Sequence, residues 1–269
     1  MSLRKLTQRN IKKVAPTCLL SDAAKEMQTA KIGSIFIEEG NRFTSVITET
    51  DFIRKAIAGD LPSDTTNCSI ISSPLIDIDI EKSPRDANHL MHFNGVRHLA
   101  VSENGQVVGL LSVRDLVRHF LEDADSPLTE MTDIFEPLTV LMHHDIHSIE
   151  ETASVKEAAK KMASKKVGSL IITAKGISVG IVTETDLVRK VIGCNLSPET
   201  LPVGDIMNAP IIDIDKTASL REANKVMAAN GIRHLIVTDA GKMIGILSIR
   251  DIIGMVSIRD LPRFFSEKT

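Results

Sequence analysis

The chain has 269 residues, enough for one large domain or two small ones that bury a hydrophobic core. Its formal net charge of -3, from 32 basic and 35 acidic residues, argues against a protein that binds duplex nucleic acid, because such binding draws on a basic excess. No segment approaches the ~18 apolar residues of a membrane-spanning helix. Cys18, Cys68 and Cys194 are odd in number and form no C-x-x-C pair, so we expect buried thiols in a reducing compartment. Both observations favour a cytoplasmic protein.

The N-terminal part is predicted to fold as strand, helix, strand, strand, helix. Apolar residues at helical spacing predict a helix over residues 21–30, with Ser21 or Asp22 as its N-cap. Short apolar strands at 34–37 and 45–47 flank a Gly-Asn turn, and a helix with one apolar face follows. Five basic residues near the N-terminus are interpreted as a solvated arm: Arg4, Lys5, Arg9, Lys12 and Lys13.

The same order recurs three times. Residues 76–80 alternate isoleucine with aspartate, which predicts a strand with one wet face, and Gly95 is suited to the left-handed position that ends the next helix. A polar stretch at 125–136 is interpreted as a linker between two halves. The later elements are predicted as helices at about 154–165, 186–194, 219–229 and from 250, and strands at 169–173, 178–183, 211–215, 234–238 and 243–248.

One motif recurs in all four units: an apolar strand, then Ser or Thr, two residues and an Asp. The first and third aspartates are 135 residues apart and the second and fourth 136 apart. Residues 74–115 align with 210–251 without a gap, with 22 of 42 positions identical. The copies therefore alternate A-B-A-B, as two tandem pairs. Their predicted bounds are 8–66, 67–124, 137–200 and 201–260.

The fourth copy contains Met-Asn-x-Pro, Leu-Arg-Glu-Ala, Gly-Ile-Arg-His-Leu-Ile-Val and Gly-Ile-Leu-Ser-Ile-Arg-Asp, and this pattern closely resembles the cystathionine-β-synthase (CBS) domain. The resemblance covers almost the whole chain as four CBS repeats of β-α-β-β-α type, a mixed α/β fold. It implies that two repeats pack through their sheets into a Bateman module with two clefts. It also implies that two modules form a flat disk, as in the gamma regulatory subunit of AMP-activated protein kinase.

The family often binds adenine nucleotides (AMP, ADP or ATP), as regulatory ligands and not as catalytic cofactors. The Ser or Thr opens a helix, whose first N–H groups and dipole favour an anion. The resemblance implies that the Asp accepts hydrogen bonds from the ribose hydroxyls, that a basic pair contacts phosphate, and that an apolar first-strand residue lies against adenine. The candidates are Ser112, Asp115, Ser248, Asp251, Thr183, Asp186, Thr48 and Asp51 for the motif, Arg97, His98, Arg233 and His234 for phosphate, and Ile76 and Ile212 for adenine.

The A copies differ from the B copies. Where the B copies have Arg-His, the first and third have Gly33-Ser34 and Gly168-Ser169, with a lysine two residues before each glycine, so their grip on phosphate is expected to be weaker. The first copy also has Ser45 where the others have glycine, and its cleft is expected to be narrower.

Two other readings stay open. Ser or Thr followed three residues later by an acid is also a capping box, and for a single copy that reading would be preferred; four copies, two with Arg-His, favour ligand sites. Arg114 and Arg250 either reach a phosphate or pair with acids on the helix.

His143 and His147 lie where a first strand should start, so a metal site is not expected there, although they could line the cleft of the third copy.

No catalytic constellation stands out, so enzyme activity is not expected. The first hypothesis is a sensor of AMP, ADP or ATP that passes its occupancy to a partner or to its own assembly. The second is a scaffold that forms a homodimer or docks onto an enzyme or transporter without binding nucleotide. The third is a binder of another adenosyl ligand, such as S-adenosylmethionine, which needs no phosphate contact.

Overall fold

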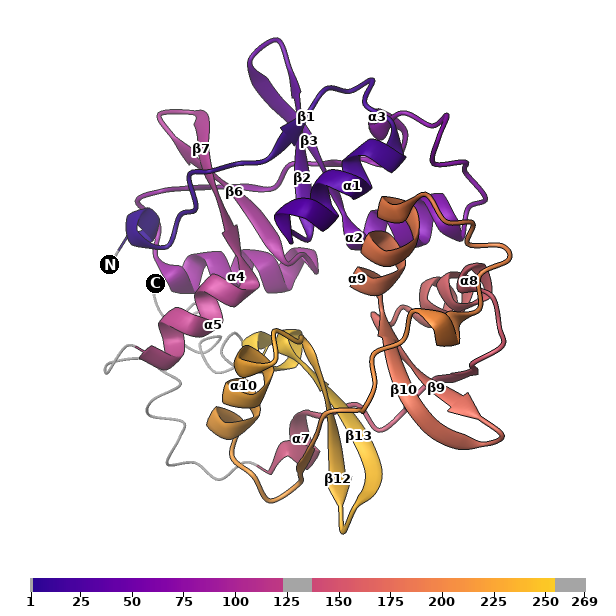
Figure 1. Cartoon of the computed structure of the whole chain (residues 1–269). Helices are drawn as coiled ribbons and strands as arrows, with labels where there is room; N and C mark the ends of the chain where they lie inside the picture. The colour runs from indigo at the N-terminus through magenta and orange to yellow at the C-terminus, as the bar shows by residue number, and fades with distance from the viewer. Residues whose placement is uncertain (1, 123–136, 255–269) are drawn as a thin grey trace. The chain divides into compact units, whose positions relative to one another are not determined.

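Each copy of the repeat is built around a β-hairpin preceded by a helix (Figure 1). The structure is a computed structural model that describes residues 2–122 and 137–254. The predicted linker at 125–136 and the predicted end of the fourth copy lie outside these residues. Within them, the mixed α/β fold and the fourfold repeat are confirmed.

The elements recur in the same order in every copy. The first copy contains β1 (Lys13–Val14), α1 (Leu20–Ala30), β2 (Ser34–Glu39), β3 (Arg42–Thr48), α2 (Glu49–Asp51) and the π-helical η2 (Phe52–Ile57), after a short η1 (Leu3–Lys5). The second contains α3 (Cys68–Ile71), β4 (Ser73–Pro74), β5 (Asp77–Asp79), α4 (Pro84–Asn94), β6 (His98–Glu103), β7 (Gln106–Ser112) and α5 (Val113–Glu122).

The second half repeats this plan. The third copy contains α7 (Leu138–Leu141), β8 (Ser148–Glu150), α8 (Val155–Lys165), β9 (Ser169–Ala174), β10 (Ile177–Thr183), α9 (Glu184–Asp186), η3 (Leu187–Val191) and η4 (Ile192–Cys194). The fourth contains η5 (Val203–Asp205), β11 (Asp213–Asp215), α10 (Leu220–Ala229), β12 (His234–Asp239), β13 (Lys242–Ser248) and helical residues 249–254.

The strands of each copy combine one parallel and one antiparallel pairing, and β4 of the second copy adds an antiparallel edge strand to β3 of the first. A short first strand runs parallel to the first hairpin strand, which pairs antiparallel with the second, as in β5-β6-β7 and β11-β12-β13. The hairpin turns need two residues with positive φ, and Gly40-Asn41 and Asn104-Gly105 supply them, as the sequence predicts. The turn of each hairpin therefore sets which residues of its two strands are paired, and with them the position of the motif at the end of the second strand.

The helix ends follow the predicted chemistry, with one exception. Gly95 ends α4 at φ 64°, and Ser83 and Asp86 form a capping box at its start. Ser154 caps α8 in the same way, and its backbone N–H and hydroxyl, by donating to Glu157, lower the pKa of that carboxyl. The predicted N-cap of α1 is wrong: the helix begins one residue earlier, and its N-cap Leu19 offers no side-chain oxygen.

The chain divides into two compact units that each join alternate copies. Unit 1 contains residues 1–10, 76–145 and 212–269, and therefore the second and fourth hairpins. Unit 2 contains residues 11–75 and 146–211, and therefore the first and third.

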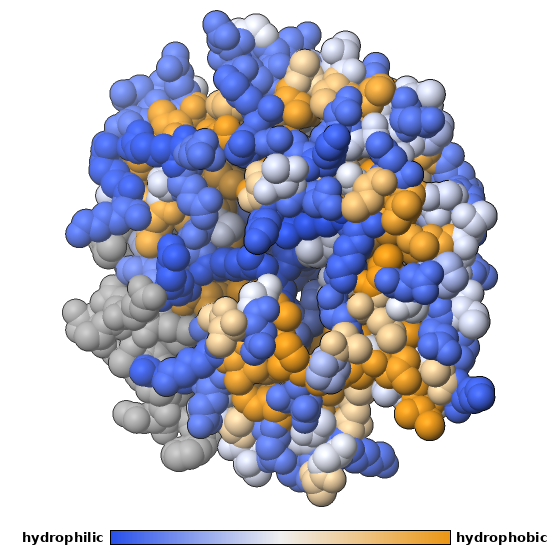
Figure 2. Space-filling view, in the orientation of Figure 1, coloured by the Kyte–Doolittle hydropathy of each residue, from blue (hydrophilic) through white to orange (hydrophobic). Residues whose placement is uncertain are grey.

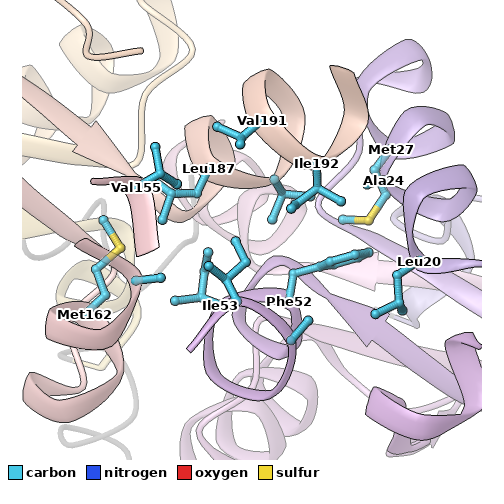
Figure 3. Close-up of a cluster of buried hydrophobic side chains, with 14 of the residues drawn as sticks. Leu20, Ala24, Met27, Phe52, Ile53, Val155, Met162, Leu187, Val191 and Ile192 are labelled. Atoms are coloured by element: carbon cyan, nitrogen blue, oxygen red, sulfur yellow. The ribbon is translucent and has the colours of Figure 1, made fainter. Parts of the chain in front are cut away.

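Helices of both copies share one hydrophobic core in unit 2, where Phe52 is fully buried among side chains of α1, α8 and η3 (Figure 3). The core of unit 1 joins the second and fourth copies in the same way.

The N-terminal segment is not the solvated arm that its basic residues suggest. Leu3 is fully buried in the unit 1 core, and its N–H donates to the carbonyl of Ile80 at 3.0 Å. Arg4 forms ion pairs with Glu81 and Glu103. One buried apolar side chain therefore anchors a segment whose basic side chains lie exposed at the surface.

Hydrophilic residues cover much of the face shown in Figure 2, with hydrophobic ones between them. Isolated large apolar side chains are exposed in the described part of the chain, among them Phe93 and Ile177. No helix within residues 2–122 and 137–254 is both long and apolar enough to cross a bilayer.

The expectation of three buried thiols is wrong for Cys194, which is exposed at the end of η4, and Cys18 is only partly buried. Cys68 is fully buried, next to Cys18. Burial raises the pKa of both Cys18 and Cys68 above the usual range of a thiol.

We predict that iodoacetamide at pH 8 modifies Cys194 in the native protein and spares Cys18 and Cys68, because the thiolate is the reactive form and burial disfavours it. Peptide mass mapping before and after unfolding in urea measures the modification at each site. Native modification of Cys68 at the rate of Cys194 would contradict the described packing.

Candidate functional site

The four motifs occupy the same place in the four copies. Each Ser or Thr ends the second hairpin strand and opens the following helix, and the Asp three residues later turns back to it. The backbone N–H of the Ser or Thr donates to Oδ2 of its Asp at 2.9 Å in the first, second and third copies and at 2.7 Å in the fourth. The carboxylate half of a capping box is therefore present at every motif.

The predicted basic pairs lie beside the motifs of the B copies. The hairpin register places His98 opposite Ser112 and His234 opposite Ser248. The carbonyl of Arg97, a residue only 7% exposed, accepts a hydrogen bond from the N–H that follows Ser112, at 2.8 Å. The structure thus brings the predicted Arg-His and Ser-x-x-Asp residues together in unit 1.

The equivalent positions in unit 2 hold serines. Ser34 pairs with Thr48 and Ser169 with Thr183 in the same register. Both serines are buried, at 4% and 7% exposure. The sites of the A copies are therefore built on the same backbone without a basic pair.

Ile76 and Ile212 lie immediately before β5 and β11, at the start of the first strand as predicted. Their side chains are partly buried against the unit 1 core. Their carbonyls accept hydrogen bonds from the hairpin, at 2.9 Å from Ala100 and 3.3 Å from Ile236. Contact with adenine at these residues remains a prediction.

Four short segments near the starts of the copies contribute side chains to the sites. We call them the lead-in segments: Thr7–Gln8, Ser72–Ser73, Met142–His143 and Met207–Asn208. Each lies antiparallel to the second hairpin strand of the other copy in its tandem pair. The paired residues are Gln8 with Leu110, Ser73 with Val46, His143 with Ile246 and Asn208 with Ile181. Tandem copies therefore exchange their lead-in segments.

The side chains of the lead-in segments reach the motif aspartates. Gln8 Nε2 donates to both carboxylate oxygens of Asp115, at 2.9 and 2.8 Å. The hydroxyl of Ser73 donates to Oδ1 of Asp51 at 2.8 Å. In the second half, Asn208 Nδ2 contacts Asp186 Oδ2 at 2.9 Å, and His143 Nε2 contacts Asp251 Oδ1 at 3.0 Å.

The motifs by themselves do not predict these partners. By its place in the sequence His143 could line the cleft of the third copy, but it contacts Asp251 of the fourth, because the lead-in segment crosses to the other copy of the pair. A signal was available: Gln8 and His143 are 135 residues apart, as are Ser73 and Asn208, and this is the spacing of the duplicated halves.

A lysine strengthens the contact in unit 2. Lys55 Nζ lies 2.8 Å from Asp51 Oδ1 and from the carbonyl oxygen of Ile71, and 2.7 Å from the Ser73 hydroxyl. Lys190 repeats these contacts with Asp186 and with the lead-in segment of the fourth copy. His119 occupies the corresponding position of the second copy, so the lysine is a feature of the A copies.

The glycine of each hairpin strand leaves room for the lead-in segment. A Cβ at Gly109 would collide with the γ-methyl of Thr7 and lie 2.9 Å from the carbonyl oxygen of Gln8. A Cβ at Gly180 would lie 2.5 Å from the sulfur of Met207. In the first copy the residue is Ser45, and the lead-in segment supplies Ser72, with no γ-methyl or thioether.

Family comparison agrees with the repeat. The family model described as the CBS domain matches residues 3–58, 68–122, 138–193 and 203–258, well over half of the chain. Protein MK0525 of Methanopyrus kandleri is 39% identical over 111 residues, which are 40% of this chain and 57% of that protein. Protein MJ1225 of Methanocaldococcus jannaschii is 25% identical over 182 residues, 64% of each protein. The alignments thus span about three fifths of the length of these relatives.

Two crystal structures share the fold over nearly the whole chain. That of MJ1225, described as a candidate archaeal homologue of γ-AMPK, has a TM-score of 0.76 at 17% identity and covers 95% of this chain and 99% of that one. A conserved protein of Pyrococcus horikoshii has a TM-score of 0.61 at 19% identity, covering 95% of this chain and 100% of that one. At these identities the likeness is one of fold.

We predict that Gly109→Ala lowers the free energy of unfolding by ~1–3 kcal/mol, because the added methyl group overpacks the strand against the stiff side chain of Thr7. Urea denaturation measures the change. The double variant Gly109→Ala/Thr7→Ser should recover part of the loss, since serine lacks the γ-methyl and keeps the hydroxyl that donates to Leu3, while the contact with the carbonyl oxygen of Gln8 remains. Equal stability of Gly109→Ala and the wild type would show that the lead-in segment packs elsewhere.

Proposed function

The chain belongs to the CBS domain family, and from this premise we propose that it is a regulatory protein that binds adenine nucleotides, AMP, ADP or ATP, at the motif aspartates. The family is regulatory and generally non-catalytic, and nucleotide sensing is typical of it. The bound nucleotide would be a signal and not a cofactor. The cysteine pattern suits a cytoplasmic setting for such a role.

The observation that carries the proposal is the placement of an Arg-His pair beside a hydrogen-bonded aspartate in both B copies. An arginine offers a permanently charged, forked donor to a phosphate, and a histidine adds charge as pH falls. The carboxylate three residues into the helix accepts hydroxyl and amide donors. One short stretch therefore combines groups for a sugar with groups for a phosphate.

The lead-in contacts support a sugar at the aspartates. The hydroxyl of Ser73 donates to Asp51 in the way that a ribose hydroxyl would. The amide of Gln8 makes the comparable contact with Asp115. A nucleotide would replace these donors, while the N–H of the capping residue keeps its own bond to the carboxylate.

Such replacement offers a route from binding to regulation. Each lead-in segment is the start of one copy and is held by the aspartate of its tandem partner. Displacing its side chain loosens one copy's hold on the other. A ligand that favours the displaced arrangement shifts the population toward it, since only a difference in affinity between two states can do so. An enzyme, a transporter or a second copy of the chain would then respond.

We predict that AMP stabilises the wild-type protein and does not stabilise Asp115→Ala/Asp251→Ala. Thermal unfolding measures the effect, and a ligand at a hundred times its Kd adds ~2.7 kcal/mol per site. Asp86→Ala is the matched control, because it removes a capping box of the same geometry at the start of α4, away from the motifs. It should cost ~0.5–2 kcal/mol of stability and keep the whole response to AMP.

The outcomes separate the hypotheses. If both Asp115→Ala/Asp251→Ala and the control Asp86→Ala lost the response to AMP, the motif aspartates would be helix-capping residues without a specific role in binding. No response of the wild type to any adenine nucleotide at millimolar concentration, with a stable dimer or complex on size exclusion, would favour the scaffold.

We predict that Arg97→Ala/Arg233→Ala weakens AMP at least tenfold relative to adenosine, because of the two ligands only AMP has a phosphate for a guanidinium group to contact. Calorimetry of both ligands gives this ratio, which a general loss of stability would not change. An unchanged ratio, together with loss of binding in the Asp variants, would favour an adenosyl ligand without phosphate, such as S-adenosylmethionine.

A further inference from the structure

The two kinds of copy differ in the summed charge of six equivalent positions, namely the pair that begins the hairpin and the four residues of the motif. In each B copy these positions hold two arginines and one aspartate, a formal charge of +1 with neutral histidine. In each A copy they hold one glutamate and one aspartate, a charge of -2. The backbone is the same, so the three-unit difference belongs to the side chains.

The added acids of the A copies are Glu49 and Glu184, the first helical residues after Thr48 and Thr183. Glu49 is fully buried and Glu184 is 4% exposed. Their helices, α2 and α9, contact each other within unit 2. Both carboxylates therefore lie in the interior, next to the two motifs of that unit.

The carboxylates are held by named partners. The hydroxyl of Thr50 donates to Glu184 Oε1 at 3.0 Å, and Arg189 Nη2 lies 3.3 Å from Glu49 Oε1. These bonds join the first copy to the third. Nearby cations are also engaged, because Lys55 and Lys190 contact the motif aspartates.

The fold itself does not require acids at these positions. In unit 1 the equivalent residues are Val113 and Ile249, buried at 4% and 6% exposure. Capping does not require them either, since the aspartates already fill the capping position. Even with the partners described above, a buried carboxylate is often no more stabilising than an apolar residue of similar size. Its presence where Val113 and Ile249 serve in unit 1 therefore calls for a further explanation.

We propose that Glu49 and Glu184 are specificity-determining residues that exclude phosphate-bearing ligands from the sites of the first and third copies. Phosphorylated nucleotides then bind only in the second and fourth copies, beside Arg97 and Arg233. The A copies accept an adenine ligand without phosphate, through Asp51 and Asp186. This inference rests on the proposed function and assigns a ligand class to each unit.

The physical basis is repulsion between like charges away from water. A phosphate beside a buried carboxylate meets a repulsion that bulk solvent would largely screen. A nucleoside has no charge and does not meet it. The same glutamates should therefore discriminate between AMP and adenosine, whose sugars and bases are identical.

Calorimetry of the intact chain with AMP and with adenosine tests the proposal. The wild type should bind two equivalents of AMP. Asp115→Ala/Asp251→Ala should lose AMP and still bind adenosine. Adding Glu49→Gln/Glu184→Gln to that variant should restore AMP binding, with affinity at least tenfold higher, and leave adenosine affinity within twofold. Glutamine keeps the size of the side chain and its acceptor for Thr50, and thermal unfolding checks that the variants fold.

Three results would overturn the inference: four equivalent AMP sites in the wild type, no gain of AMP affinity on adding the glutamines, or no adenosine binding once the B sites are removed. Each leaves the proposed function intact if AMP still binds the second and fourth copies. If the wild type binds neither ligand, the proposed function fails as well, and the two failures are thus distinguishable.

Discussion

The hydrogen bonds of the motif aspartate hold each site together. One carboxylate joins the end of a hairpin strand, the first turn of a helix and a side chain from the tandem partner copy. These parts come from distant places in the chain: Gln8 and Asp115 are 107 residues apart. The aspartate accepts a local hydrogen bond from the first residue of its own motif and a long-range one from the tandem partner copy. Because the same carboxylate does both, the sequence pattern alone does not distinguish a helix cap from a ligand site.

The duplicated copies share this backbone and differ in the residues around the aspartate. The B copies have arginine and histidine beside it, and the A copies have glutamate and threonine there with a lysine one turn later. Each compact unit combines two copies of one kind, so the difference in charge is gathered unit by unit. Similar backbones can in this way carry arginines beside the motif in one unit and buried glutamates within the motif in the other.

The exchange of lead-in segments gives the tandem pairs a physical link. A segment that belongs in sequence to one copy lies on the hairpin of the other, in a groove that needs glycine at position 109, 180 or 245. The first copy reaches the same fit with two serines, Ser45 and Ser72. The expected narrowing by Ser45 is thus accompanied by a smaller neighbour in the lead-in segment. Pairing of adjacent copies through their sheets, which the resemblance implies, stays a prediction.

The sequence by itself determined the repeat, the order of elements and the motif, because these depend on local periodicity, turn residues and a spacing that duplication preserved. It identified Arg97 and Asp115 as neighbours through the resemblance, and the hairpin register agrees. Only the tertiary structure decided that Leu3 anchors the N-terminus, that Gln8 and His143 reach the aspartates of other copies, and that Glu49 and Glu184 are buried side chains of one unit. These features depend on contacts between segments that are distant in the sequence, for which local patterns carry no information.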